Sequence, residues 1–284
     1  MHIPRYWARR VQSAQGPNGL ARRIACWGWS DVSLSEAQTR AEDRVAAIAL
    51  KVRAGQELDR YGYADRPLRE EIVDVIRDHA GGEAALITRN QYGAQVLNAA
   101  RALFIDIDFP ETSAGGGLVG AVQQLFGARP QDPAAPHLER LGAWARRNPF
   151  LGLRVYRTAA GLRGVVTNEV FDPARGDALD ILRQLGSDPL YVRLCQAQGC
   201  FRARLTPKPW RCAVSGPPAR FPWDDVGSEA RFREWERRYA HASTKYAVCK
   251  PVAAFGPRDV HPDLIDLLAY HDRFTLATQE RPLA

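Results

Sequence analysis

The stretch LGLRVYRTAAGLRGVVTNEVF, residues 151–171, places the strongest constraint on what this chain can fold into. It contains two runs rich in Val, Leu and other strand-forming residues, joined by the short segment AAG. Two such runs around a short loop with glycine are typical of a β-hairpin. A hairpin is antiparallel, because parallel neighbours need a crossover of a dozen or more residues. The sequence therefore predicts antiparallel sheet near the middle of the chain.

Helical patterns and further strand-like runs alternate along the rest of the chain. Helices are expected in the segments 33–54, 66–82, 137–148, 172–186, 228–242 and 261–277. Strands are expected at 22–29, 83–90, 101–108 and 244–256, and a second hairpin at 189–208. The strands at 83–90 and 101–108 are predicted to pair, since only residues 91–100 separate them. The Gly- and Pro-rich segment 111–136 is expected to be a loop with a short helix around 118–126. This mixture favours an α+β fold with a mostly antiparallel sheet and packed helices.

The composition is compatible with a polyanionic partner. The net charge is +7, the pI is about 9.4, and only four of the 39 basic residues are lysines. An arginine excess of this kind is also typical of a bacterial protein from a G+C-rich genome, so both explanations stay open. The start, MHIPRYWARR, lacks the apolar stretch of a signal peptide, and no run approaches the roughly 20 apolar residues of a membrane span. With an odd number of scattered cysteines, we expect a cytoplasmic protein without a membrane partner.

Two carboxylates stand at the end of one predicted strand, in the stretch RALFIDIDFP. Successive strand side chains point to opposite faces, so Asp106 and Asp108 should share one face, opposite Ile105 and Ile107. Neighbouring carboxylates repel each other unless a cation lies between them. A divalent cation such as Mg²⁺ commonly takes one or two protein carboxylates. The alternative is a strand end that is simply solvated.

Basic side chains gather in two later segments. Arg157 and Arg163 flank the bend of the predicted hairpin, and the alternation in FRARL puts Arg202 and Arg204 on one strand face. Lys208 follows shortly after. Such cations beside acidic metal ligands fit a triphosphate that bridges the two groups. The alternative is that these arginines lie on solvated faces and pair with nearby acids.

The order of these elements resembles the catalytic core of the archaeo-eukaryotic primase superfamily, the primase-polymerases. Members carry a D-x-D on one strand, a small-residue hairpin of S-G-x-G-x-H type, a third acidic residue and a segment like R-x-P-G-(S/T)-x-N-x-K. Here DID matches the first, TAAGLR is similar to the second, Asp188 is a candidate for the third, and RARLTPKPW resembles the last. Asp172 and Asp180 compete with Asp188. Arg163 stands where the family has His, and it cannot release a proton near neutral pH.

The resemblance implies an RRM-like sheet in a core at about 84–212, with α/β additions at 1–83 and 213–284 in one globular unit. It implies two-metal nucleotidyl transfer on nucleic acid, with Mg²⁺ or Mn²⁺ held by Asp106 and Asp108. The implied catalytic carboxylates are Asp106, Asp108 and Asp188; the nucleotide- and phosphate-binding residues are Arg157, Thr158, Arg163, Arg202, Arg204 and Lys208. Apart from the resemblance, Arg89, Asn90 and Tyr92 stand in or beside a predicted turn before the D-x-D strand, where they could line the same site or could simply form the turn. Two alternatives stay open: a catalytically inactive nucleic-acid- or nucleotide-binding protein of the same fold, and a metal-dependent enzyme acting on a phosphorylated small molecule.

Other signatures are missing from the sequence. The cysteines form no C-x-x-C pair, so zinc is not expected, and there is no H-E-x-x-H, P-loop or G-x-G-x-x-G motif. Several aromatic residues beside Gly and charged residues have two possible roles, core packing or the stacking of bases. They are Trp27, Trp29, Tyr61, Tyr63, Tyr92 and Trp210.

Overall fold

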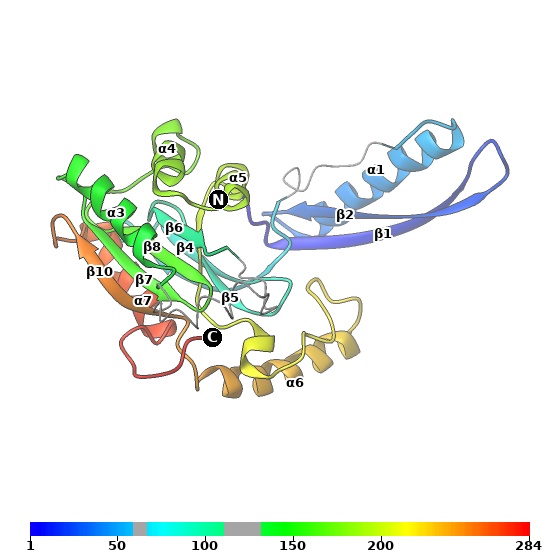
Figure 1. Cartoon of the computed structure of the whole chain (residues 1–284). Helices are drawn as coiled ribbons and strands as arrows, with labels where there is room; N and C mark the ends of the chain where they lie inside the picture. Colours follow the sequence, from blue (N-terminus) through cyan, green and yellow to red (C-terminus); the bar gives the residue numbers. More distant parts are fainter. Residues whose placement is uncertain (59–66, 111–131) are drawn as a thin grey trace, which may run out of the picture.

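The computed structural model of the chain describes residues 1–58, 67–110 and 132–284, and it has an α+β fold, as predicted (Figure 1). Its strands form three sheets in which the strand pairs are antiparallel, where the sequence suggested one sheet. The first contains β1 (Tyr6–Gln15) and β2 (Ala21–Ser30). The second has the order β10 (Cys249–Phe255), β7 (Leu153–Thr158), β8 (Gly161–Val166) and β6 (Phe104–Asp108). The third has the order β3 (Glu71–Arg77), β4 (Glu83–Arg89), β5 (Gln95–Ala99) and β9 (Phe201–Arg204).

The helices pack around these sheets. They are α1 (Leu34–Arg53), α3 (Ala135–Arg147), α4 (Gly176–Leu185), α5 (Pro189–Gln198), α6 (Val226–Ser243) and α7 (Ile265–Phe274), with short 3₁₀ turns η1 (Pro209–Cys212) and η2 (Pro262–Leu264). The expected helices that become α1, α3, α4, α6 and α7 are confirmed, as is the strand that becomes β10. Within the described residues, no helix combines the length and the apolar character needed to cross a membrane.

The predicted hairpin is confirmed as β7 and β8, and its small residues have a packing role. β8 lies between β7 and β6, with Gly161 opposite Asp108. A Cβ atom on Gly161 would lie 2.0 Å from the carbonyl oxygen of Ile107, which no side chain can tolerate. Glycine at this position therefore allows the hairpin to approach the D-x-D strand.

The two four-stranded sheets meet where β6 lies beside β9, and they share one apolar core cluster. The hydroxyl of Tyr191 on α5 donates to the carbonyl oxygen of Phe104 at 2.9 Å and accepts from the backbone N–H of Arg202 at 3.2 Å. The backbone N–H of Asp188 donates to the carbonyl oxygen of Asp106 at 2.9 Å. The start of α5 thus fastens the two sheets to each other, and we call this junction the β6–β9 seam.

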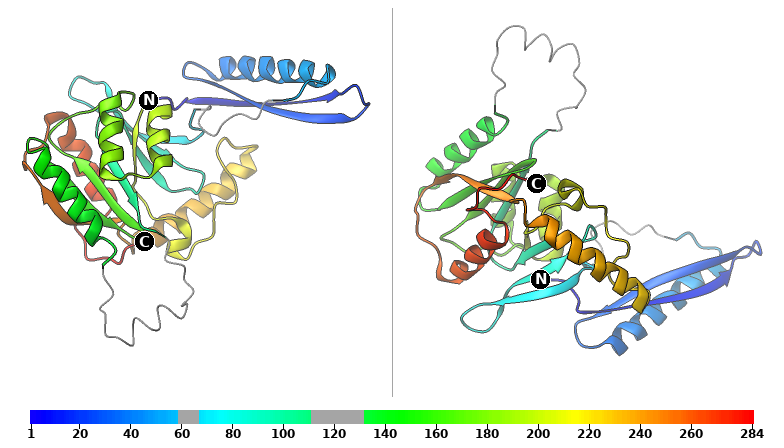
Figure 2. Two further views of the ribbon diagram at one scale, coloured as in Figure 1. Left: turned by 45° about the horizontal axis from the view of Figure 1, so that its top comes forward. Right: turned by 90° about the horizontal axis from the view of Figure 1, so that it is seen from below.

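The first sheet and α1 form a separate layer that projects from one side of the molecule (Figures 1 and 2). Ser33 caps α1, since its side chain accepts from the N–H of Glu36 at 3.2 Å. The helix lies against one face of β2, where a Cβ on Gly28 would come within 2.2 Å of the Ala37 carbonyl oxygen. We call β1, β2 and α1 the N-terminal wing.

Three sequence predictions are wrong. The segment expected to be a helix at 66–82 contains β3, because the β-branched run Ile72–Ile76 favours extended backbone and pairs with β4. β4 pairs with β5 rather than with β6, since a turn at Asn90–Gly93 reverses the chain. The first half of the expected hairpin at 189–208 is the helix α5, which begins with Pro189.

Most of the expected loop at 111–136, including its expected helix at 118–126, lies outside the described residues. β3 and β10 come from outside the core expected at 84–212, and each occupies an edge of a four-stranded sheet.

The seam predicts a stability effect for Tyr191→Phe. The change leaves the ring in place and removes the hydroxyl, so the Phe104 carbonyl and the Arg202 N–H lose a buried partner. We expect the free energy of unfolding to fall by about 1–3 kcal/mol. Urea denaturation measures it, with Tyr6→Phe at an exposed position on β1 as the matched control. Equal stability of the two variants would contradict a bridging role for Tyr191.

Candidate active site

Asp106 and Asp108 lie on one face of β6, as predicted from their spacing. Ile105 and Ile107 are completely or almost completely buried, whereas Asp106 is half-buried and Asp108 is exposed. In the register with β8, Asp106 is opposite Arg163 and Asp108 is opposite Gly161. The apolar side chains therefore hold the strand in the core while both carboxylates stay on the other face.

The two carboxylates and their neighbours form a strongly coupled charge cluster. Burial raises the pKa of Asp106, and the charges of Asp108 and Asp188 raise it further, whereas Arg163 and Arg204 act in the opposite direction. A negative charge at this position thus depends on nearby positive charge. A divalent cation between Asp106 and Asp108 would supply more of it.

Arg163 is held in place from two sides and is only 3% exposed. Its Nη1 donates to the carbonyl oxygen of Arg204 at 2.9 Å, which adds a second link across the β6–β9 seam. The same Nη1 lies 3.0 Å from Nε2 of His271 on α7. Arginine can only donate, so Nε2 accepts, and the imidazole carries its proton on Nδ1.

His271 connects Arg163 to a partly buried chain of polar side chains. Its Nδ1 donates to Oδ1 of Asp272 at 2.9 Å, and this carboxylate also accepts from the Tyr156 hydroxyl at 2.7 Å and from Arg154 at 3.1 Å. Burial lowers the pKa of His271 to about 4; the Arg163 charge acts the same way, and the hydrogen bond to Asp272 opposes it. The imidazole is therefore neutral at neutral pH and can accept from Arg163.

Sequence reasoning missed His271 and Asp272. The available signal was a histidine on the apolar face of the closing helix, three and four residues after the buried Leu268 and Leu267. That pattern does not reveal which residue the imidazole meets, because α7 and β8 are about a hundred residues apart in sequence.

Two further cations lie beside the carboxylates. Burial lowers the pKa of Arg204, with Arg163 and Arg211 contributing and Asp106 opposing. Burial also lowers the pKa of Lys208, where Arg204 and Arg211 act the same way and both Asp108 and Asp106 oppose it. Cations that repel one another at a partly buried position form a site for an anion such as phosphate. Arg211 was not among the predicted site residues.

The structure places the other predicted phosphate ligands in different contacts. Nη2 of Arg202 donates to both carboxylate oxygens of Glu70, each at 2.9 Å. Arg157 donates to Asp132 at 3.2 Å, and its guanidinium carbon lies 4.4 Å from the Phe109 ring centroid. Thr158 ends β7 opposite Cys249.

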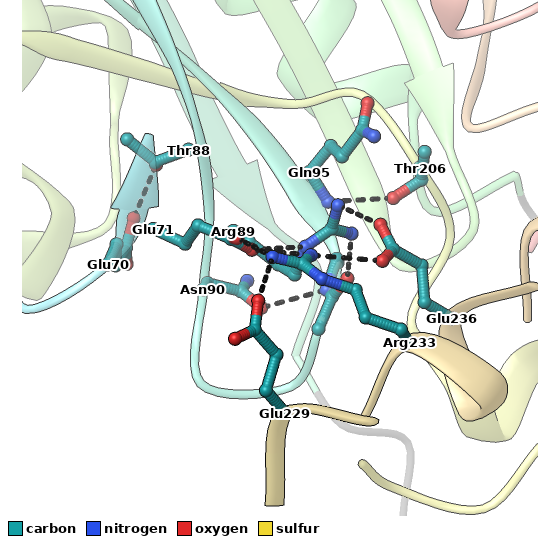
Figure 3. Close-up of polar contacts among 12 residues, drawn as sticks. Glu70, Glu71, Thr88, Arg89, Asn90, Gln95, Thr206, Glu229, Arg233 and Glu236 are labelled. Carbon is teal, nitrogen blue, oxygen red and sulfur yellow. Dashed lines mark hydrogen bonds and ion pairs between the residues drawn. The ribbon is translucent and has the colours of Figure 1, made fainter. Parts of the chain in front are cut away.

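The predicted lining residues Arg89, Asn90 and Tyr92 belong to the β4–β5 turn. Arg89 is buried in an ion network with Glu71 on β3 and Glu236 on α6, in which Arg233 also takes part (Figure 3). Asn90 closes the turn by accepting from the N–H groups of Tyr92 and Ala94. Tyr92 packs edge-on against Trp210, with ring centroids 5.2 Å apart. Arg89 and Asn90 therefore have structural partners, and the network ties α6 to the third sheet.

The third predicted carboxylate, Asp188, has a structural role. Its side chain accepts from the N–H of Tyr191 at 2.8 Å and caps α5. It precedes a helix, where the sequence predicted a strand. Across residues 1–58, 67–110 and 132–284, no group of three or more His, Cys, Asp or Glu side chains is arranged to hold a metal ion. The expected meeting of three carboxylates is therefore not found there.

Comparisons of this chain with protein-family models, with curated proteins and with solved structures each give no match. The resemblance to the primase-polymerases therefore remains a prediction from short motifs. The chemistry of the site has to be argued from the residues themselves.

The buried imidazole predicts a pH dependence of stability. The pKa of His271 is about 4 in the folded chain and about 6.5 in an unfolded one, so only the unfolded chain gains this proton between those values. Stability should therefore fall as the pH drops from 6.5 to 4, by about 3 kcal/mol from this residue.

In His271→Gln this part of the slope should disappear, because glutamine does not titrate. Denaturation midpoints across pH 4–7 measure the slope, with the exposed His241→Gln as the control. An unchanged slope in His271→Gln would show that the imidazole has the same pKa in the folded and the unfolded chain.

Proposed function

We propose that this protein catalyses metal-dependent nucleotidyl transfer on nucleic acid. One observation carries the proposal: two carboxylates share a face of β6, and cationic side chains from β8, β9 and the segment after β9 surround them. Carboxylates suit a divalent cation, and the cations suit the phosphates of a nucleotide. The net charge of +7 supports a polyanionic partner.

The donor set fits Mg²⁺ or Mn²⁺. Asp106 and Asp108 provide hard oxygen ligands, and two carboxylates are the number that Mg²⁺ usually takes when waters and substrate phosphates complete its coordination. A bound ion would supply activation of a 3′-hydroxyl and neutralisation of the leaving pyrophosphate.

The chain's own cations bind and orient the triphosphate. His271 and the Arg204 carbonyl oxygen hold the Arg163 guanidinium in place before a ligand binds. Its contribution to phosphate binding is electrostatic. Arg204 and Lys208 complete the positive side of the site, where burial strengthens their attraction for phosphate oxygens.

A second candidate function has an observation of its own. Because Asp188 caps α5 and the described residues provide only the pair on β6, the same site also fits a catalytically inactive protein that binds nucleotide or nucleic acid. An enzyme acting on a phosphorylated small molecule would bind nucleotide but not oligonucleotide. The incorporation assay below separates nucleotidyl transfer from the other two cases, and binding of an oligonucleotide separates those two from each other.

Removing the carboxylates tests the transfer reaction. Asp106→Asn/Asp108→Asn keeps the size of both side chains and removes their charge, so we expect incorporation of labelled nucleotide to drop by about 100-fold or more. The assay uses Mn²⁺ and a panel of single-stranded templates. The control is Asp43→Asn at an exposed position on α1. Extension by the double variant at the wild-type rate would end the proposal, and no extension by the wild type would favour the inactive binder.

Lys208 should act on nucleotide binding. Lys208→Ala removes a charge-assisted contact to phosphate worth about 1.5–3 kcal/mol, which corresponds to a KM for nucleotide raised about tenfold or more. Steady-state kinetics measure it, with Lys245→Ala, an exposed lysine after α6, as the control. An unchanged KM would place the triphosphate elsewhere.

A further inference from the structure

A cleft separates the N-terminal wing from the rest of the chain, and it lies outside the site around Asp106. Its volume is about 630 Å³, within the range of ligand-binding pockets. Its walls carry the aromatic side chains of Trp27, Trp29, Tyr92 and Trp223, and the cations Arg44, Lys51, Arg69 and Arg220. The proposed function does not use this cleft.

The alternation of β2 directs two tryptophans into the cleft. Ile24, Cys26 and Gly28 lie on the face covered by α1, so Trp27 and Trp29 lie on the opposite face. Both tryptophans are only half-buried, which is unusual for side chains whose role is to fill a core. Across the strand pair, Trp29 is opposite Trp7 and Trp27 is opposite Arg9.

Guanidinium groups stand over both indole rings. The Arg44 guanidinium carbon lies 3.8 Å from the Trp29 ring centroid, and Nη1 of the same arginine donates to the Trp27 carbonyl oxygen at 3.1 Å. The Arg69 guanidinium carbon lies 4.5 Å from the Trp27 ring centroid. Flat cationic and aromatic groups are thus held next to each other, the arrangement on which unpaired bases stack.

The cleft continues into a second, more open hollow of about 470 Å³. Both hollows are lined by Trp27, Arg69 and Phe221, and the second adds Arg9. Because the two hollows share Trp27 in their walls, the combined groove suits an elongated ligand better than a single nucleotide.

The charge of the groove favours an anionic ligand. Among the described residues that line the first hollow, the acidic one is Glu70, which Arg202 already pairs. In the second hollow the acidic residue is Asp224, whose Oδ1 lies 3.2 Å from Nη1 of Arg9. The other charged side chains among the described residues that line the groove are cations.

We propose that this groove binds a single strand of nucleic acid, with bases against Trp27 and Trp29 and phosphates near the arginines. Stacking accepts every base, so the binding should be tolerant of sequence. The inference rests on the proposed function for the role of the strand, which would be the template or the strand being extended.

Binding without catalysis tests it. Fluorescence anisotropy of a labelled 20-nucleotide oligothymidine is measured with no divalent metal and no free nucleotide. We expect Trp27→Ala to bind about tenfold more weakly than wild type, and Trp27→Phe to stay near it, because phenylalanine keeps an aromatic face. Phe150→Ala, an 85% exposed aromatic away from the groove, is the matched control. A duplex of equal length should bind more weakly than the single strand.

Salt dependence supplies a readout that loss of folding does not produce. Arg220→Ala should reduce the slope of log affinity against log salt by about 0.7, as expected for one phosphate contact, while Trp27→Ala should leave the slope unchanged. Arg183→Ala on the exposed side of α4 is the control for charge. If Trp27→Ala does not fold, two other measurements test the groove. They are the salt slope of Arg220→Ala and the quenching of tryptophan fluorescence by the oligonucleotide.

The result is independent of the transfer reaction. Asp106→Asn/Asp108→Asn should bind the oligonucleotide as tightly as wild type does. An absence of the transfer reaction with oligonucleotide binding intact would therefore count against the proposed function and not against the groove. The groove proposal is overturned if Trp27→Ala binds like Phe150→Ala, if Arg220→Ala keeps the wild-type slope, or if the duplex binds as tightly as the single strand.

Discussion

The contact between β6 and β9 is the constraint on which the rest of this structure depends. The two strands belong to different sheets. The Tyr191 hydroxyl on α5 bonds to the backbone of both strands, and the Arg163 guanidinium on β8 bonds to the Arg204 carbonyl oxygen of β9. The candidate active site lies at this seam, so its geometry is only as exact as these two side chains keep it.

The seam also explains the electrostatics. Placing Asp106 beside Arg163 and Arg204 puts opposite charges together, so the two positive charges oppose the rise that burial causes in the pKa of Asp106. The chain from Arg154 and Asp272 through His271 to Arg163 extends this dependence to α7. A site of this kind is organised before a ligand arrives, which reduces the reorganisation that binding requires. The groove of the N-terminal wing, in contrast, is lined by flat aromatic side chains such as Trp27 and Trp29, on which the proposed strand binding rests.

Sequence reasoning succeeded where a local pattern decides the structure. The period of two in FIDID put Asp106 and Asp108 on one face, and the AAG bend specified the β7–β8 hairpin. It failed at β3 and at α5, where pairing with β4 and a cap by Asp188 overrode the pattern. The roles of charged side chains were the hardest to predict. Arg202 and Arg204 share a strand face, yet Arg202 forms an ion pair with Glu70, whereas Arg204 lies beside the carboxylate of Asp106.

The sequence by itself determined which side chains share a strand or helix face, because backbone periodicity alone sets that. It determined the hairpin, most helices and the pair of carboxylates with cations in later segments. Only the tertiary structure decided which cations meet those carboxylates, that His271 orients Arg163, and that Asp188 caps a helix. Such contacts join residues tens to more than a hundred positions apart, and their partners follow from how sheets and helices pack, which no local pattern encodes.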